Sequence, residues 1–280
     1  MPTARTYTFD IDTKRYLNRV NTYRSLSGLN PITNGDAVDI DNFVIGLKDL
    51  GLWNDVISWI FRSKYNIGSG TTISSLGGFH KKDATLISGS ATFPSWGTDG
   101  ISITATDQGI NTNVNQEQVF GTRGLFSSIF RLDNTTNEGR RIVTCDILGG
   151  GQGFGYDDFD TNNLRFLNNG GGGSVPKSLF NPNFGFITTG KGEVPLGINT
   201  FVNNTQYADT STNNPVTFPS SNLGVGGRHL VNISGVSSPV NSKLQINSFL
   251  VSYKTHISFQ QHQSIYSLIK TTIGKGLGLP

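Results

Sequence analysis

Apolar residues recur at about one helical turn along the first part of the chain. The first predicted helix begins after Asp12 and ends before Gly28, and the second begins after Asp36 and ends at Gly51. An Asp side chain caps a helix start, and Gly readily ends a helix. Residues 52–61 predict a third short helix. The apolar positions of the three segments are Leu17, Val20, Tyr23, Leu26, Val38, Phe43, Val44, Leu47, Leu50, Trp53, Val56, Ile57, Trp59 and Ile60.

The pattern changes to short runs of β-branched and aromatic residues from residue 70 onward. Clusters of Gly, Asn, Ser and Pro separate these runs, as turns do between short strands. Many short strands at such intervals are typical of an antiparallel sandwich or barrel. Strands are predicted at Thr85 to Ile87, Ile101 to Ala105, Leu125 to Leu132, Arg141 to Leu148, Leu164 to Leu167, Phe184 to Thr188, Asn199 to Tyr207 and Leu244 to Tyr253.

The C-terminal part of the chain returns to a helical pattern. Ser258 and Gln261 have the spacing of a capping box, in which each side chain satisfies a backbone donor at the start of a helix. Gly274 is predicted to end this helix in a left-handed turn. A helix of this length is marginal alone, so its apolar stripe is expected to lie on the sandwich or on the N-terminal helices. The stripe consists of Ile265, Leu268, Ile269 and Ile273.

These patterns predict a mainly β fold in two parts. Residues 1–69 are interpreted as an N-terminal helical docking segment, and residues 70–280 as an antiparallel β-sandwich that ends in a helix. Phe43, Trp53 and Trp59 are expected to form a buried cluster in the helical segment. The same three residues are assigned to assembly and docking.

The composition narrows the classes of function. Charged residues make up 15% of the chain, against about 25% in typical domains. The net charge is +3 without a basic stripe, so no nucleic-acid partner is expected. A single cysteine, Cys145, excludes an internal disulfide and a cysteine-rich zinc site. The chain has neither a long apolar run nor a secretory signal peptide, so no membrane insertion is expected.

Four short motifs follow one another in a recognisable order. Residues 83–86 read Asp-Ala-Thr-Leu, and residues 96–101 read Trp-Gly-Thr-Asp-Gly-Ile. Residues 201–205 read Phe-Val-Asn-Asn-Thr, and residues 223–227 read Leu-Gly-Val-Gly-Gly. In this order the motifs resemble the concanavalin A-like lectin and glucanase superfamily, which includes laminin-G-like domains. The resemblance implies a jelly-roll sandwich with a hairpin turn in which Asn204 replaces the family's usual Gly.

Two further segments resemble virion proteins of tailed phages that carry such a jelly roll. Residues 41–56 are similar to the helical segment that precedes it, and residues 249–273 are similar to the strand and helix that close it. The resemblance implies a virion structural protein that contacts other virion proteins and copies of itself, with host glycan as a further candidate partner. Capsid decoration and a head or tail fibre remain alternatives.

Catalysis is not expected from the sequence, because the carboxylates that a glucanase needs are not recognisable. Such an enzyme places two carboxylates across the sugar, one as nucleophile and one as acid. Glutamate occurs only at Glu117, Glu138 and Glu193, each of them isolated. The sequence therefore predicts a non-enzymatic protein without catalytic residues, and a glycan-processing enzyme on the same fold is the alternative.

The stretch from Gly149 to Gly173 holds the candidate binding site. Asp158, Asp160 and Asn162 alternate there, and oxygen ligands at this spacing suit calcium, a hard cation. Calcium or glycan binding is one interpretation of this stretch, and the other is that Gly, Asn and Asp are simply the residues that tight turns require. Three aromatic residues in the same stretch can supply a stacking face for a sugar ring, namely Phe154, Tyr156 and Phe159.

The histidines are scattered and do not predict a metal site. No two of them have the i, i+4 spacing of a helical metal pair. His262, on the predicted C-terminal helix, is interpreted as a surface or packing residue. Calcium at the stretch above is therefore the only candidate cofactor. The four histidines are His80, His229, His256 and His262.

Overall fold

Helices and strands account for most of the described residues in a computed structural model. The residues that it describes are 7–105, 107–115, 124–132, 141–145, 154–157, 162–167, 174–191, 198–208, 222–226, 230–231, 237–238 and 245–280. The helices are α1 (Ile11–Leu26), α2 (Asn34–Asp49), α4 (Phe259–Thr271) and the short 3-10 helices η1 (Trp53–Asp55) and η2 (Lys177–Phe180). The strands are β1 (Val56–Ile60), β2 (Thr72–Ile73), β3 (Ser75–Gly78), β4 (Ala84–Ser88), β5 (Ser95–Trp96), β6 (Ile101–Ile103), β7 (Gln108–Asn115), β8 (Gly124–Leu132), β9 (Arg141–Cys145), β10 (Phe154–Asp157), β11 (Asn163–Leu167), β12 (Ser174–Pro176), β13 (Gly185–Lys191), β14 (Ile198–Val202), β15 (Thr205–Ala208), β16 (Asn222–Val225), β17 (Leu230–Val231), β18 (Ser237–Ser238) and β19 (Gln245–Tyr253).

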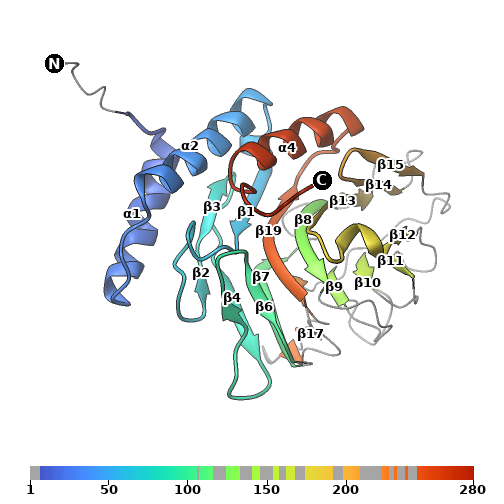
Figure 1. Ribbon diagram of the computed structural model, residues 1–280, viewed down its shortest axis with the longest axis horizontal. Coiled ribbons are helices and arrows are strands. Elements are labelled where there is room, and N and C mark those ends of the chain that lie inside the picture. The colour runs from blue at the N-terminus through green and yellow to red at the C-terminus, as the bar shows by residue number, and fades with distance from the viewer. Residues whose placement is uncertain are drawn as a thin grey trace.

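Two large sheets carry all of these strands except β17 and β18, which pair with each other, and every strand pairing in the described ranges is antiparallel. One sheet has the order β15-β14-β13-β8-β19-β1-β3, with β6 beside the start of β19 and β5 beside β6. The other has the order β12-β11-β10-β9-β16-β7-β4-β2. Figure 1 shows the strands, and they confirm the predicted mainly β antiparallel sandwich.

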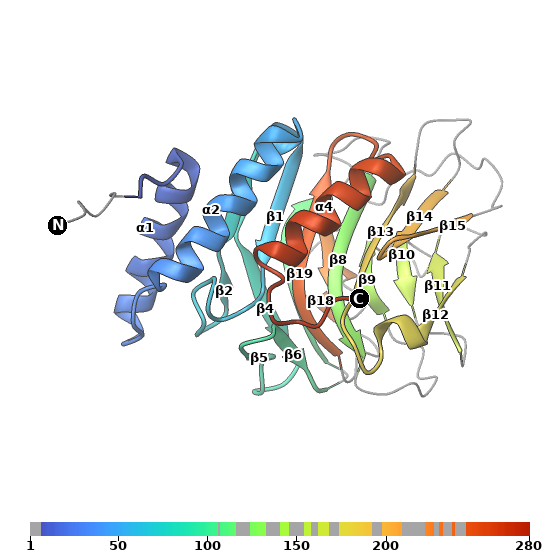
Figure 2. The same cartoon turned by 45° about the horizontal axis from the view of Figure 1, so that its top comes forward.

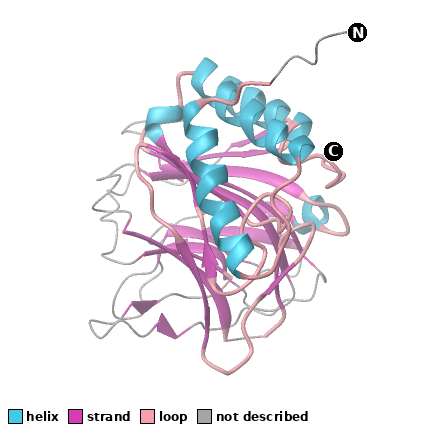
Figure 3. Ribbon diagram, turned by 90° about the vertical axis from the view of Figure 1, so that its left-hand side faces the viewer, coloured by secondary structure: helices cyan, strands magenta, loops and turns pink. Residues whose placement is uncertain are grey.

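The three α-helices cover the outer face of the sheet that contains β1 and β19, which we call the helix-covered sheet (Figures 2 and 3). Phe43 of α2 meets Phe249 of β19 edge to face, with ring centroids 5.5 Å apart. Gly46 of α2 lies directly under Leu268 of α4, and a Cβ at this position would collide with the leucine side chain. The glycine therefore lets the two helices approach closely on the sheet.

The helix-covered sheet is consequently buried on both faces. One apolar core fills the space between the helices and this sheet, and the other lies between the two sheets. All five residues of β1 are buried, with Val56 and Ile60 in the first core and Ile57 and Trp59 in the second. A strand buried on both faces loses its alternation of apolar and polar residues.

The predicted third helix at residues 52–61 is wrong for this reason. Its apolar run is short and continuous, and periodicity alone does not distinguish such a run from a buried helix. The segment instead forms η1 and then β1, whose Trp59 pairs with Leu250 of β19. The predicted division of the chain at residue 70 stays a prediction, although β1 places part of the N-terminal segment inside the larger sheet.

The other helix boundaries differ little from the predicted ones. Asp10 caps α1 by accepting a hydrogen bond of 2.9 Å from the backbone N–H of Asp12. Thr33 caps α2 in the same way, with 3.2 Å between its Oγ1 and the backbone nitrogen of Asp36. The predicted caps, Asp12 and Asp36, therefore lie in the first turns.

The C-terminal helix confirms its predicted capping box, which Ser258 and Gln261 form in both directions. The helix ends at Thr271, earlier than predicted, and Gly274 does not adopt a left-handed conformation. Its stripe lies on the helix-covered sheet, as expected.

In the β14–β15 hairpin the left-handed residue is Asn203, at φ 51°, and not Asn204. No helix in the described ranges is long and apolar enough to cross a membrane.

Candidate functional site

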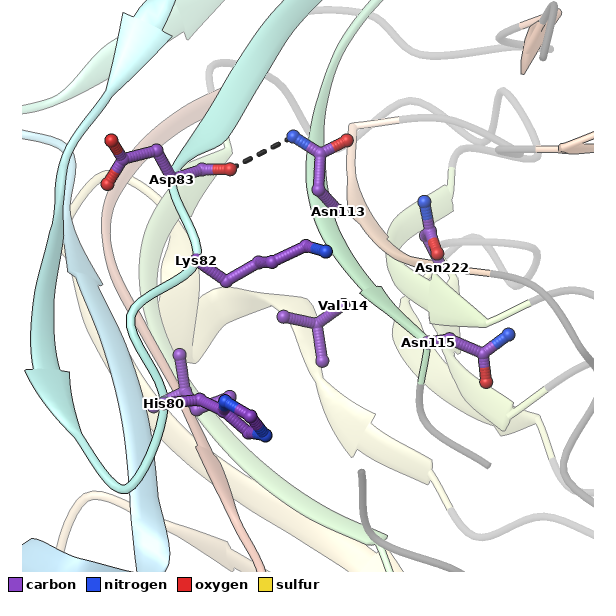
Figure 4. Close-up of a pocket in the computed structure, with 8 residues that line it drawn as sticks. His80, Lys82, Asp83, Asn113, Val114, Asn115 and Asn222 are labelled. Atoms are coloured by element: carbon purple, nitrogen blue, oxygen red, sulfur yellow. Dashed lines mark hydrogen bonds between the residues drawn. The ribbon is translucent and has the colours of Figure 1, made fainter. Parts of the chain in front are cut away.

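A polar cavity of about 670 Å³ opens between the two sheets near one edge of the sandwich. Figure 4 shows its two walls, with the loop from β3 to β4 on one side and strands β7 and β16 on the other. The floor is apolar, whereas most of the side chains on the walls carry amides or charges. The lining residues are Ile57, His80, Lys82, Asp83, Asn113, Val114, Asn115 and Asn222.

The loop wall is held in place through its backbone. The indole N–H of Trp59 donates a hydrogen bond of 2.7 Å to the backbone oxygen of Lys82. The backbone N–H of Lys82 donates to Ser75 Oγ at 3.0 Å, and the backbone N–H of Ser75 donates to Asp83 Oδ1 at 2.9 Å. Because these bonds fix the main chain of the loop, the exposed side chain of Lys82 projects from a rigid base.

The strand wall presents a row of amides. Asn113 has a left-handed backbone, at φ 58°, and its Nδ2 donates to the backbone oxygen of Asp83 at 2.9 Å and to Thr85 Oγ1 at 3.1 Å. Asn222 Nδ2 donates to Asn111 Oδ1 at 3.1 Å. The amide nitrogens are therefore engaged, and in the described ranges Asn113 Oδ1 and Asn222 Oδ1 accept no hydrogen bond. These two oxygens are available to a ligand.

The charges at the cavity are unevenly compensated. Asp83 Oδ1 accepts from Ser75 and lies 4.0 Å from Arg19 Nη2, so this carboxylate has partners on the side of α1. Lys82 Nζ makes no ion pair and no hydrogen bond with any described residue. Among the described lining residues, Asn113 Oδ1 and Asn222 Oδ1 are therefore acceptors without a donor, and Lys82 Nζ is a cation without a partner.

A second cavity, of about 390 Å³, lies where α1 meets η1, and its charges are paired. Lys48 Nζ lies 2.7 Å from Asp10 Oδ1 and 2.8 Å from Asp12 Oδ2. Trp53 Nε1 donates to Asp12 Oδ2 at 3.0 Å. Since each of these groups already has a partner, this cavity fits a structural role that joins α1 to α2 and η1.

A buried polar chain lies under α4. The His262 side chain is fully buried, and its ring stacks on Phe186 at 5.0 Å between centroids. Its Nε2 lies 2.6 Å from the backbone oxygen of Asn203 and its Nδ1 lies 2.7 Å from Thr188 Oγ1. A carbonyl only accepts, so Nε2 carries the proton and Nδ1 accepts from the threonine hydroxyl. Burial lowers the pKa of His262 to about 4, although the bond to Asn203 raises it, and His262 is therefore a neutral packing residue.

The predicted calcium or glycan site falls mostly outside the described residues. This holds for Asp158, Phe159 and Asp160. Tyr156 lies in β10, where it pairs with Phe166 and Val143, and Asn162 is exposed just before β11. No three potential metal ligands cluster within the described ranges. Binding at this stretch stays a prediction, which glycan binding with calcium and with a chelator would test.

The predicted docking residues divide between the two cores. Phe43 and Trp53 lie in the core under the helices, as expected, whereas Trp59 lies in the core between the sheets. All three side chains are buried, with exposed fractions of 0%, 7% and 0%. They therefore stabilise the fold of this region, and a docking role for the segment stays a prediction.

Sequence reasoning missed the cavity, although the sequence carries a signal for it. Residues 111–115 read Asn-Thr-Asn-Val-Asn, in which Asn alternates with buried Thr112 and Val114. This alternation is typical of a strand with one polar face. The partner residues on the loop lie far away in sequence, so only the sheet order brings the walls together.

Comparison with known proteins gives structural neighbours alone. No family model matches the chain, and no curated protein matches it. A sialidase of Trypanosoma rangeli in complex with sialic acid aligns with a TM-score of 0.60 at 12% identity, covering 93% of this chain and 38% of the sialidase. The binding domain of botulinum neurotoxin serotype D/C aligns with a TM-score of 0.50 at 11% identity, covering 77% of this chain and 52% of that domain. These identities show a shared fold, and the chain spans well under half of the sialidase.

The neighbours change one expectation from the sequence. The prediction that the chain is not an enzyme is contradicted, because several of the structures that it resembles are sialidases, which are glycan-processing enzymes. The fold is therefore one that occurs in glycan-processing proteins. The lectin-like sandwich expected from the sequence agrees with these neighbours.

Proposed function

We propose that the chain is a carbohydrate-binding unit of a glycan-processing protein, and that the polar cavity beside Lys82 holds the sugar. The observation that carries this proposal is the set of unengaged polar groups on two fixed walls. A sugar hydroxyl donates one hydrogen bond and accepts others. Asn113 Oδ1 and Asn222 Oδ1 can accept from hydroxyls, and Lys82 Nζ can donate to them.

The size and rigidity of the cavity support the same proposal. Its volume of about 670 Å³ lies within the range of about 300 to 1,000 Å³ that is usual for small-molecule sites. Hydrogen bonds fix the loop through Trp59 and Ser75, so little ordering is needed when a ligand binds. The apolar floor, Ile57 and Val114, suits the C–H faces of a sugar ring.

The cavity supports recognition better than hydrolysis. Hydrolysis of a glycosidic bond commonly uses two carboxyl groups on either side of the bond. Of the described residues, Asp83 is the one carboxylate that lines the cavity, and its Oδ1 already accepts from Ser75. A catalytic step would therefore need groups beyond this cavity, and a sugar-release assay on every glycan that binds will reveal such a step.

A glycan microarray with the purified chain tests the proposal. We expect selective binding that Asn222→Ala weakens at least several-fold, because the substitution removes an acceptor from the strand wall. Asn204→Ala is the matched control, since Asn204 is an exposed asparagine of the β14–β15 turn. A chain that is folded by circular dichroism and binds no glycan would contradict the proposal, as would equal binding by both variants.

The virion location expected from the sequence resemblance stays a proposal. So do contacts with other virion proteins, with copies of the chain itself and with host glycan. Labelling of intact phage particles with antibodies against the chain is the direct test. Labelled particles would support the location, and labelling confined to the soluble fraction of lysed host cells would contradict it.

A further inference from the structure

Among the described residues that line the cavity, Lys82 is a cation whose side chain has no ion-pair partner. Figure 4 shows it extending from the loop toward the opposite wall, near Asn113 and Val114. Its Nζ makes no ion pair or hydrogen bond with any residue that the structure describes. Asp83, the acidic residue among the described lining residues, accepts a hydrogen bond from Ser75 and lies 4.0 Å from Arg19. The ammonium group is therefore left to pair with a ligand.

The groups that face Lys82 from the strand wall are neutral. Asn113 and Asn222 bring amides whose nitrogens donate within the protein, which leaves their oxygens as acceptors. These amide oxygens accept hydrogen bonds from hydroxyl groups. They disfavour a ligand with a second anionic group, because the lone pairs of an amide oxygen and an anionic oxygen repel each other. One end of the cavity thus fits a single negative charge, and the other fits neutral hydroxyls.

We propose that the cavity selects an acidic sugar that carries one negative charge, a carboxylate that Lys82 Nζ binds while the ring hydroxyls donate to Asn113 Oδ1 and Asn222 Oδ1. This inference rests on the proposed glycan-binding function and names the class of its ligand. A charge-assisted hydrogen bond between an ammonium group and a carboxylate is stronger than one to a neutral hydroxyl. A neutral sugar would also remove water from the lysine without supplying a counter-charge.

Calorimetric titration with two methyl glycosides tests this selectivity. Methyl glucuronide and methyl glucoside differ only in the carboxylate, so the ratio of their dissociation constants measures what the charge contributes. We expect the glucuronide to bind at least about tenfold more tightly, with an affinity that falls as salt is added. Lys82→Met should abolish the ratio, Lys82→Arg should keep most of it, and Lys81→Met is the control at an exposed neighbour that does not line the cavity.

The outcomes separate the two proposals. Equal binding of both glycosides by the unmodified chain would overturn the selectivity and leave glycan binding standing. An unchanged ratio in Lys82→Met would overturn the role of Lys82. Binding of neither glycoside, together with an empty glycan microarray, would overturn both proposals. The Lys82 variants keep their backbone hydrogen bonds to Trp59 and Ser75, so loss of the ratio in a folded variant reports on the side chain alone.

Discussion

The indole N–H of Trp59, in the core between the sheets, donates a hydrogen bond of 2.7 Å to the backbone oxygen of Lys82 at the rim of the cavity. A residue of the packed interior thereby sets the position of a residue that lines the cavity. The link joins β1 to the loop between β3 and β4 and makes the shape of this cavity wall depend on core packing.

Trp59→Phe should weaken glycan binding several-fold and lower the free energy of unfolding by about 2 kcal/mol, because the Lys82 carbonyl loses a partly buried hydrogen bond and the core loses volume. Microarray titration and chemical denaturation measure the two effects. Trp96→Phe is the matched control, since Trp96 Nε1 also donates to a backbone oxygen, that of Gly70, at 3.0 Å, but does not line the cavity. Unchanged binding by Trp59→Phe would show that the loop keeps its position without this bond.

The stability of the chain should fall with acidification between pH 6.5 and about 4. Burial lowers the pKa of His262 from 6.5 to about 4, so the unfolded chain binds a proton in this range before the folded chain does. Neutral His262 contributes about 3 kcal/mol to the free energy of unfolding. This contribution is fully present above pH 6.5 and is lost as the pH falls toward the pKa of the folded state. His256, whose pKa burial also lowers, adds to the loss with the same sign.

Denaturation at several pH values measures this slope, and two variants identify its source. His262→Phe should flatten the slope, whereas Thr188→Val, which removes a hydrogen-bond partner and keeps the imidazole, should lower stability and retain the slope. A slope that survives in His262→Phe would assign the pH dependence to other groups.

Gly78→Ala should destabilise the fold by about 3 kcal/mol. Gly78 ends β3 at φ 109°, pairs with Ile57 of β1, and has the backbone oxygen of Val56 where a Cβ would stand. Gly51→Ala is the control, because Gly51 has a φ of 71° but no atom within 4 Å of the added Cβ. Its expected cost is about 1 kcal/mol. Equal effects in thermal denaturation would exclude steric contact with β1 as the cause.

Arg62→Met should release the residues that follow α4. The buried guanidinium of Arg62 donates to the backbone oxygens of Thr98, Ile273 and Lys275 at 2.9, 2.7 and 2.8 Å. Loss of the guanidinium leaves these carbonyls without a donor and should lower the free energy of unfolding by about 3 kcal/mol.

Limited proteolysis after Thr271 and chemical denaturation measure the release. Arg15→Met is the control, because the Arg15 side chain is 60% exposed and lies 3.6 Å from Asp12. It should change stability by less than about 0.5 kcal/mol. Proteolysis at the same rate in both variants would mean that the tail is held without Arg62.

The sequence predicts best the elements whose patterns are local. The capping box at Ser258 and the glycine that ends α1, Gly28, follow from a few neighbouring residues, and both are found. β1, the strand that contains Trp59, cannot be predicted from its own residues alone, because its burial on both faces depends on helices and strands elsewhere in the chain. Alternation of apolar and polar residues identifies a strand with one exposed face, and β1 has no exposed face.

The candidate site was harder to predict than the fold. No spacing in the sequence relates the residues of its walls, which are His80, Lys82, Asp83, Asn113, Val114, Asn115 and Asn222. Pairing of β7 with both β4 and β16 brings them side by side. The left-handed Asn113 also depends on a bond to the backbone of Asp83, which is visible only once the strands are paired.

The central place of β1 has a consequence for biosynthesis. Its partner β19 lies near the opposite end of the chain, and Trp59 reaches its neighbour Leu250 only when that strand has been made. A ribosome therefore releases a strand with four apolar residues out of five long before they can be covered, and such sequence-distant pairing folds slowly. Until then the nascent strand is a natural target for chaperones and for aggregation with other unfinished copies.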